Sequence, residues 1–575
     1  MKIRITPKHA PTRAYALMLV LVFTGIGMLV MTGALNWAAN TANLTERNNQ
    51  YNATLLAAEA ASEKILTRII RDYQLNGEST VYNNLSTYRS AIPSEADNSY
   101  WANFQFNNAQ GTVGQTYVDR TVTSQYVPLD SKYSGLSAFA STYRIVSNAK
   151  PLNSPYNLTA AVQQEVQTAS IPIFQFAVFY QGDMELNGAA TLHVRGRVHG
   201  NANLYTGSSS PIYFYEDVTV AGAIVQGSRY GWSASVTPTY YKKKETNVST
   251  MTLPIGTDST PDNIRQVTQI PPAGESATSP MGQQRYFNKA ELLILVSNST
   301  VTVGVKTPFA TTTNLIPYAQ VTNFINTNVT FTDQRESKTM KVTEIDVGKF
   351  SQWAATNTIA NTILGGVPPN LIYVADNRTV TSSQLTGVRL VNGHTLPSRG
   401  LTVATPNPIY TKGHFNCPNG TYAGTTNTSN TKPASIIADA FTLLSANFTD
   451  SASGSSYTSR VPVTGTTVNA AIIAGNVPSA SGYSGGINNL PRLLEHWSGK
   501  NYWLNGSLVC LYNSIKASQP FQNPGVYYSA PSRNINFDVN FRDPAKLPPG
   551  TPELRAVIRT KWVNPPPATV SYTGS

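Results

Sequence analysis

The sequence predicts a membrane-anchored, mainly β protein. It is expected to have an N-terminal transmembrane helix, then an antiparallel β region, and finally a right-handed parallel β-helix, for which a β-sandwich is the alternative. An uncharged apolar run lies near the N-terminus, an alternating apolar pattern follows it, and short apolar strands separated by Gly, Asn and Pro fill the second half of the 575 residues. Because no long helical pattern interrupts these strands, we expect β structure throughout that half.

The N-terminus divides into a basic leader, residues 1–14, and an apolar run, residues 15–36. No charged residue lies between Tyr15 and Leu35, and at about 1.5 Å of rise per residue this run spans the roughly 30 Å hydrocarbon core of a bilayer. Four Lys and Arg residues precede the run, and the first acidic residue is Glu46. The positive-inside rule therefore predicts a single-pass inner-membrane protein with a cytoplasmic N-terminus and its bulk exported to the periplasm or cell surface.

A cleaved secretory signal is the alternative, because it shares the basic start. The apolar run is longer than the usual signal core of about 7 to 15 residues, and no Ala-x-Ala cleavage site follows it. Residues 37–76 are predicted to continue as a helical stalk that ends at Gly77. One face of this stalk carries small and apolar residues at three- and four-residue steps: Tyr51, Leu55, Ala58, Ser62, Ile65 and Ile69.

The stalk contains Glu46-Arg47-Asn48-Asn49 and Leu56-Ala57-Ala58-Glu59-Ala60-Ala61. With the basic leader and the membrane helix, these motifs resemble the N-terminus of PilX-like type IV pilus assembly proteins, which are related to minor pilins. The resemblance implies that the helix packs with pilin helices, with Ala57, Ala58, Glu59, Ala60 and Ala61 in the contact, and that a head projects outward. Major pilins have Gly before the cleavage point and Glu at the fifth mature position, whereas this chain has Ala14 and Leu19. Processing by a prepilin peptidase therefore does not follow from the resemblance.

Residues 77–170 are predicted to form a pilin-like β region. Residues 159–168 alternate as a half-buried strand does, residues 143–147 are its expected neighbour, and residues 151–155 are the turn between them. Residues 171–227 contain Val194-x-Gly196-x-Val198, and the same pattern returns as Val220-x-Gly222-x-Ile224. This repeat favours solenoid-like coils and resembles bactofilin-like β-helices, while ordinary hairpins remain the alternative.

Residues 228–370 are predicted to be a mixed β region, with a strand at 291–296 and one helix over 349–364. Residues 371–575 are predicted to be the β-helix domain with a C-terminal tail. Three of its segments, residues 400–410, 434–440 and 483–489, look like segments of large exported PilX-like proteins. This resemblance implies an envelope role and supplies no catalytic residues.

The composition indicates which classes of partner the protein can bind. The formal charge is +12, but only 13% of residues are charged and Lys242-Lys243-Lys244 is the one tight basic run, so we expect no nucleic-acid binding. Scattered positive charge favours weak attraction to anionic lipid or cell-wall polymers. Cys417 and Cys510 have no metal-binding spacing, and in an oxidising periplasm they can either pair in a disulfide or stay as buried free thiols.

No catalytic motif, cofactor site or metal site is recognised. Asp439, inside an apolar strand, and Glu495-His496-Trp497 are the strongest candidates for polysaccharide cleavage, and structural roles are favoured for both. His193 and His199 are expected on the same outward strand face, where Arg195 and Arg197 would repel a metal ion.

These observations predict a non-enzymatic structural component or assembly factor, similar to a minor pilin, of a type IV pilus or related secretion filament. The expected partners are pilin or minor pilin subunits, through the N-terminal helix, and the inner membrane. A surface polysaccharide-binding adhesin is the second hypothesis, for which 30 tyrosines and 7 tryptophans supply stacking surfaces. A polysaccharide-cleaving β-helix enzyme is the third.

Overall fold

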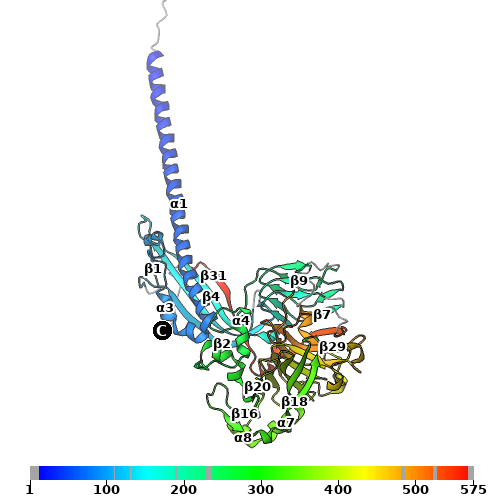
Figure 1. Ribbon diagram of the computed structural model, residues 1–575. Helices are drawn as coiled ribbons and strands as arrows, with labels where there is room; N and C mark the ends of the chain where they lie inside the picture. Colours follow the sequence, from blue (N-terminus) through cyan, green and yellow to red (C-terminus); the bar gives the residue numbers. More distant parts are fainter. Residues whose placement is uncertain are drawn as a thin grey trace, which may run out of the picture.

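A long N-terminal helix projects from a β-rich head (Figure 1). The computed structural model describes residues 12–108, 111–129, 133–187, 191–227, 229–230, 236–480, 486–521 and 527–566. Most of the basic leader, and the Tyr483-Ser484-Gly485 part of the third PilX-like segment, lie outside the described residues.

The predicted membrane helix and stalk form one helix, α1 (Thr12–Asn76). Its 65 residues correspond to a length of about 98 Å. The helix ends at Gly77, as predicted, and Gly77 has φ of 88°, the left-handed conformation that glycine adopts without strain. The Gly77 N–H donates to the carbonyl oxygens of Asp72 and Tyr73 at 3.2 and 3.0 Å, which satisfies two of the last helical carbonyls.

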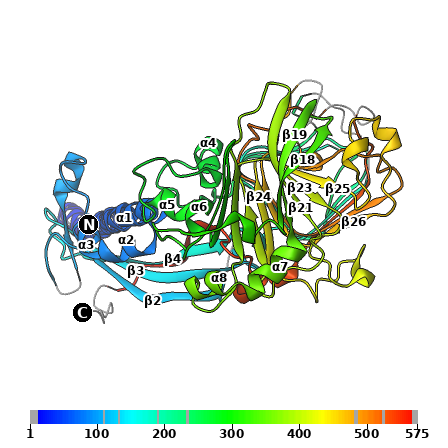
Figure 2. The ribbon, with the colours of Figure 1, turned by 60° about the horizontal axis from the view of Figure 1, so that its bottom comes forward.

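An antiparallel sheet lies against the second half of α1 (Figures 1 and 2). The short helices α2 (Glu78–Asn83) and α3 (Leu85–Arg89) precede it. Its strands are β1 (Phe104–Asn107), β2 (Tyr117–Pro128), β3 (Ser137–Pro151), β4 (Ala160–Pro172) and β31 (Glu553–Val563), in the order β1-β3-β4-β31 with β2 also on β3. The two predicted strands are confirmed as neighbours, since β3 and β4 pair from Ala149–Ala160 onward, but the connection between them runs over residues 152–159 because Pro151 still belongs to β3. The assignment of residues 371–575 to one domain with a tail is wrong at β31, which pairs with β4.

Three parallel ladders follow β4. The first joins β5 (Val178–Tyr180), β8 (Val198–Gly200), β11 (Val218–Val220) and β14 (Lys244–Glu245); the second joins β6 (Met184–Leu186), β9 (Leu204–Thr206) and β12 (Ile224–Gln226); the third joins β7 (Leu192–Arg195), β10 (Ile212–Phe214) and β13 (Thr239–Tyr240). Val178 pairs with Val198, and Val198 pairs with Val218, so the first ladder repeats at a constant interval over these three strands.

The predicted repeat, which matched Val194 with Val220, is therefore wrong in register. Val194 pairs with Phe214, and Val220 pairs with Gly200. Matching Val194 with Val220 aligned β7 with β11, which belong to different ladders. All these strands are short with apolar residues at alternate positions, so the sequence pattern alone does not distinguish one ladder from another.

The chain then continues through α4 (Pro261–Arg265), α5 (Pro280–Gln284) and α6 (Tyr286–Lys289) to a second set of strands. A parallel ladder joins β15 (Leu292–Val296), β20 (Leu371–Asp376), β22 (Leu401–Ala404), β24 (Ala434–Ala438), β27 (Ala471–Ala474) and β29 (Asn501–Cys510), and Leu508 of β29 pairs with Val178 of β5. Two stretches of chain, residues 177–245 and 291–537, thus share one continuous stack. The short strands predicted between residues 371 and 510 are all present.

The remaining strands form the other sides of this stack (Figure 2). One sheet contains β18 (Ile325–Asp333), β19 (Lys338–Asp346), β21 (Gln384–Val391), β23 (Ile409–Lys412), β25 (Phe441–Leu444) and β28 (Pro491–Leu493). β26 (Thr466–Val468) pairs with β29, which pairs with β30 (Ser532–Phe537), and β30 pairs with β7. β16 (Val301–Val305) and β17 (Asn314–Ile316) extend β15 antiparallel.

The predicted helix over residues 349–364 is two helices, α7 (Val347–Thr356) and α8 (Thr358–Ile363). Asn357 separates them because its side chain accepts a hydrogen bond from the Ala360 N–H at 2.9 Å, an N-cap that starts a new helix. The main core lies inside the stack and includes Val178, Val198 and Ile436. A second core, which includes Ile437, lies between the stack and the antiparallel sheet, so both faces of the central ladder are buried.

Candidate functional site

The first half of α1 is an apolar helix with exposed side chains. All side chains of residues 15–49 are exposed, and the segment with the highest hydropathy averages 2.2, enough for a membrane span. An exposed apolar surface of this extent is typical of a membrane or protein interaction site. The prediction of one N-terminal helix long and apolar enough to cross a membrane is confirmed.

The second half of α1 packs on the antiparallel sheet. Ala58, Ser62, Ile65 and Ile69 of the predicted stripe are fully buried, whereas Tyr51 is exposed. Ile65 and Ile69 pack with residues of β2, β3 and β4 in one apolar cluster. The stripe therefore anchors the helix to its own head.

The role of the Ala-Ala-Glu-Ala-Ala motif is corrected by this packing. Ala57, Ala58 and Ala61 are fully buried against the side chains of Phe106, Ala149 and Val162 in the same chain. Glu59 and Ala60 are half-buried. Because the small side chains let the helix approach the sheet, the alanines on that face are not available to a second helix.

Polar contacts fix the helix along the sheet. Glu63 accepts hydrogen bonds from Gln164 at 2.8 Å and from Arg559 at 2.6 Å. Near the end of the helix, Tyr88 and Asn84 donate to the Asp72 carboxylate at 2.6 and 2.9 Å. The first and last described parts of the chain are thereby joined, since Arg559 lies in β31.

Both cysteines are buried free thiols, which is the second of the two alternatives that the sequence left open, and no Cys417–Cys510 disulfide is present. The Cys417 sulfur lies 3.7 Å from the Asn419 carbonyl oxygen, and the Cys510 sulfur lies 3.6 Å from the Tyr512 carbonyl oxygen. Burial raises the pKa of Cys510 to about 12, so this thiol stays protonated and unreactive at neutral pH.

Asp439 and Glu495, the two carboxylates considered for catalysis, make structural hydrogen bonds, and so does the buried Asp376. Asp439 is buried and accepts hydrogen bonds from the backbone N–H groups of residues 515–517 at 2.8 to 3.1 Å. Glu495 accepts from the Ser445 N–H at 2.7 Å, and burial raises its pKa. Asp376 accepts two hydrogen bonds from the Arg378 side chain, at 2.9 and 2.6 Å.

The two histidines do not share a strand face, contrary to the prediction. His193 belongs to β7 and His199 to β8, and Gly196, with φ of 138°, turns the chain between them. His193 stacks on Tyr213, while His199 is fully buried and bonded to Thr219 and Asn201. Among the described residues, no group of three or more His, Cys, Asp and Glu is arranged to hold a metal ion.

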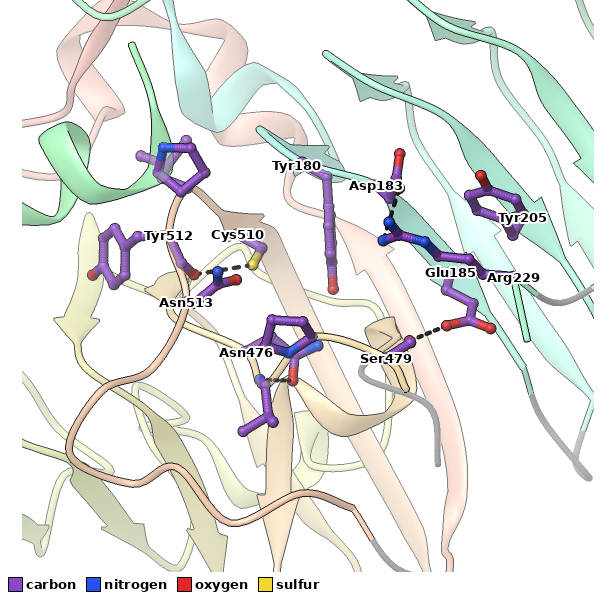
Figure 3. A pocket seen from close by; sticks show the side chains of 15 residues that line it. Tyr180, Asp183, Glu185, Tyr205, Arg229, Asn476, Ser479, Cys510, Tyr512 and Asn513 are labelled. Atoms are coloured by element: carbon purple, nitrogen blue, oxygen red, sulfur yellow. Dashed lines mark hydrogen bonds and ion pairs between the residues drawn. The ribbon is translucent and has the colours of Figure 1, made fainter. Parts of the chain in front are cut away.

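A cavity of about 200 Å³, lined by both polar and apolar side chains, lies beside the junction of the two chain stretches (Figure 3). Its polar side chains come from β5, the turn into β6, β6 itself, β9, residue 229 after β12, the loop after β27 and the residues after β29: Tyr180, Asp183, Glu185, Tyr205, Arg229, Asn476, Ser479, Tyr512 and Asn513. Asp183 pairs with Arg229 at 2.9 Å, and the Glu185 carboxylate accepts a hydrogen bond from Ser479. We call this space the Glu185 cavity.

The Glu185 cavity was not predicted from the sequence. Asp183-Met184-Glu185 is an acidic pair with one intervening residue, a spacing that places both side chains on one side of a strand, and aromatic residues lie at 180 and 205. These residues lie close together in the sequence and could have indicated the site. The contribution of Ser479 could not be predicted, because Ser479 lies in a loop far along the chain, beyond β27.

The comparisons with known proteins identify no family. No protein-family model matches the chain, and no curated protein matches it. Among solved structures, the competence-associated pilin ComZ from Thermus thermophilus aligns over 90% of this chain and 97% of its own, at 12% identity and a TM-score of 0.31.

Proposed function

We propose that this protein is a pilin-like structural subunit, in the manner of a minor pilin or PilX-like assembly factor, of a type IV pilus or related secretion filament. The observation that carries the proposal is the division of α1. One continuous helix exposes its apolar first half and packs its second half on an antiparallel sheet. This arrangement suits a subunit that is first anchored in the inner membrane with its N-terminus in the cytoplasm. During assembly, its helix would move into a bundle of similar helices.

An exposed stripe beyond the apolar run supports a protein partner in addition to lipid. Trp37, Leu44 and Tyr51 recur every seven residues and are 73%, 59% and 41% exposed. A seven-residue spacing keeps side chains on nearly one helix face. The stripe lies after the segment that a bilayer of roughly 30 Å covers, so lipid does not bury it. A neighbouring helix that packs on the stripe would bury it instead.

For the head we propose a right-handed parallel β-helix that displays surfaces outside the membrane. The parallel ladders with their constant step support it, as does an internal asparagine row at one corner: Asn505 donates to Asn469 at 2.8 Å and Asn536 donates to Asn505 at 3.0 Å. Side-chain amides that bond along a stack favour coils of constant spacing.

We further propose that the chain is not an enzyme. The buried carboxylates Asp439, Glu495 and Asp376 are occupied by backbone, serine and arginine donors, which leaves them poorly suited to proton transfer. Polysaccharide binding at the surface is the second candidate function. The specific observation that favours it is the Glu185 cavity, which combines carboxylates with tyrosines.

The test is isolation of the native protein from membranes, with N-terminal sequencing and mass spectrometry of co-purifying proteins. We expect the intact N-terminus and pilin-type subunits in the preparation. Leu44→Asp should reduce the yield of these subunits without changing the melting temperature of the head, because the Leu44 side chain is exposed. Ala42→Asp, about 200° away around the helix, is the matched control. Release of the wild-type head as a soluble protein without α1 would contradict the proposal.

A further inference from the structure

We infer that the Glu185 cavity is a binding site for one neutral sugar ring, either free or at the end of a glycan. This inference does not depend on the filament role, because it rests only on the residues that line the cavity. Figure 3 shows Tyr180, Asp183, Glu185, Tyr205 and Arg229 around the space.

The parallel register places a carboxylate beside an aromatic ring. Glu185 of β6 pairs with Tyr205 of β9, and their neighbours Met184 and Leu204 point into the core. Because side chains alternate along a strand, Glu185 and Tyr205 lie side by side on the opposite, outer face. A sugar ring offers an apolar face for stacking on an aromatic side chain and hydroxyl groups for a carboxylate, and this pair supplies both.

The Tyr180 hydroxyl is the lining group whose hydrogen bonding a ligand would complete. Tyr180 is 3% exposed, and the one side chain close enough to share a hydrogen bond with its hydroxyl is Asn476, in a contact too poorly aligned to count as a full hydrogen bond among the described residues. A buried hydroxyl whose hydrogen bonding is incomplete is costly and uncommon in folded proteins. The hydroxyl group of a ligand in the cavity would satisfy it.

The charged side chains that line the cavity indicate the chemical class of its ligand. Glu185 and Asp183 are carboxylates and Arg229 is the one cation among the lining residues, so the lining carries one net negative charge. An anionic ligand is therefore disfavoured. A polyhydroxylated neutral ligand is favoured, because each hydroxyl can donate to a carboxylate and accept from Arg229 or Tyr180.

The size of the cavity restricts the ligand further. Its volume of about 200 Å³ is many times what one water molecule needs, which leaves room for a ligand the size of one sugar ring. The protonated Cys510 thiol in the wall adds no charge, since burial raises its pKa.

The test uses the full chain in phosphatidylcholine nanodiscs, because glycoside detergents would compete for the site. D-glucose, D-galactose, D-mannose and N-acetyl-D-glucosamine are titrated by saturation-transfer NMR, with D-glucuronate as the anionic comparison. We expect at least one neutral sugar to saturate with a Kd of about 10 mM or tighter, and D-glucuronate to bind more weakly.

Two matched variants separate the site from general effects. Tyr180→Phe removes the incompletely bonded hydroxyl and should weaken binding about threefold to tenfold without lowering the melting temperature. Tyr502→Phe removes another buried hydroxyl that has no partner among the described residues, outside the cavity, and should bind as the wild type does. Failure of every neutral sugar to saturate, or equal affinity of the wild type and Tyr180→Phe, would overturn the inference.

Discussion

The side chain of Arg555, in the last strand, donates hydrogen bonds to the carbonyl oxygen of Tyr73, in the last turn of α1, at 2.7 Å, and to that of Gln74 at 3.0 Å. A cation at a helix C-terminus also interacts favourably with the helix dipole. Burial lowers the pKa of Arg555 to about 10, so it remains charged at neutral pH. The end of the chain thus stabilises the helix with which the chain begins.

Arg555→Met is expected to loosen the last turns of α1. Loss of the charged hydrogen bonds should cost about 2 kcal/mol locally, which corresponds to a roughly 30-fold faster amide exchange for residues 66–76. The measurement is hydrogen–deuterium exchange of the full chain. Arg559→Met is the control in the same strand: its ion pair with Glu63 is about 40% exposed on both sides, so exchange should change by fivefold or less, about 1 kcal/mol. Equal effects of the two variants would argue against the capping role.

Ala58→Leu is expected to destabilise the head rather than to impair assembly alone. Ala58 is fully buried against the sheet, and forcing extra methylene groups into a packed interface costs about 1 to 3 kcal/mol. Ala60→Leu, at a half-buried position of the same helix, should change stability by less than about 0.5 kcal/mol. Thermal unfolding of both variants is the measurement. An Ala58→Leu protein as stable as the wild type would show that α1 and the sheet separate easily.

Asp439→Asn is expected to destabilise the stack. The carboxylate accepts from three backbone N–H groups, and an amide that replaces it has one acceptor oxygen and an NH₂ group facing donors. The cost should be about 1 to 3 kcal/mol, measured as a lower melting temperature. Asp262→Asn, at an 80% exposed side chain, is the control and should leave the melting temperature unchanged. If Asp439→Asn instead keeps full stability and abolishes cleavage of a polysaccharide by the wild type, Asp439 is catalytic.

Acidification is expected to destabilise the protein through His199. Burial lowers the pKa of His199 from 6.5 to about 4. Between these pH values the unfolded chain binds a proton that the folded chain does not, so stability is lost as the pH falls from about 6.5 to 4, by at most about 3 kcal/mol. His199→Gln should show a flatter decline of melting temperature over this interval than the wild type. Parallel pH profiles would contradict a buried neutral His199.

Local patterns explain what the sequence predicted well. The alternation in residues 159–168 predicts β4, and the apolar run from Tyr15 with Gly77 at the far end predicts α1, because each signal lies within the element itself. The short strands from residue 371 onward are predicted for the same reason.

Long-range pairing explains what the sequence did not predict. Leu554, Ala556 and Ile558 alternate as strand residues do, but nothing in that alternation shows that β31 pairs with β4, which lies in the first third of the chain. Likewise, the junction of Leu508 with Val178 closes one stack from two distant stretches. The Glu185 cavity lies beside that junction, so only Asp183-Met184-Glu185 and the aromatic residues at 180 and 205 were visible in the sequence.

The most direct test of the filament role is photocrosslinking in living cells with a photoreactive amino acid at Leu44. We predict covalent adducts to pilin-type subunits at Leu44, whose side chain lies on the exposed stripe of α1, and none at Thr458, which is exposed on the head. Adducts absent at Leu44 while the full-length protein is present in the membrane would contradict the account.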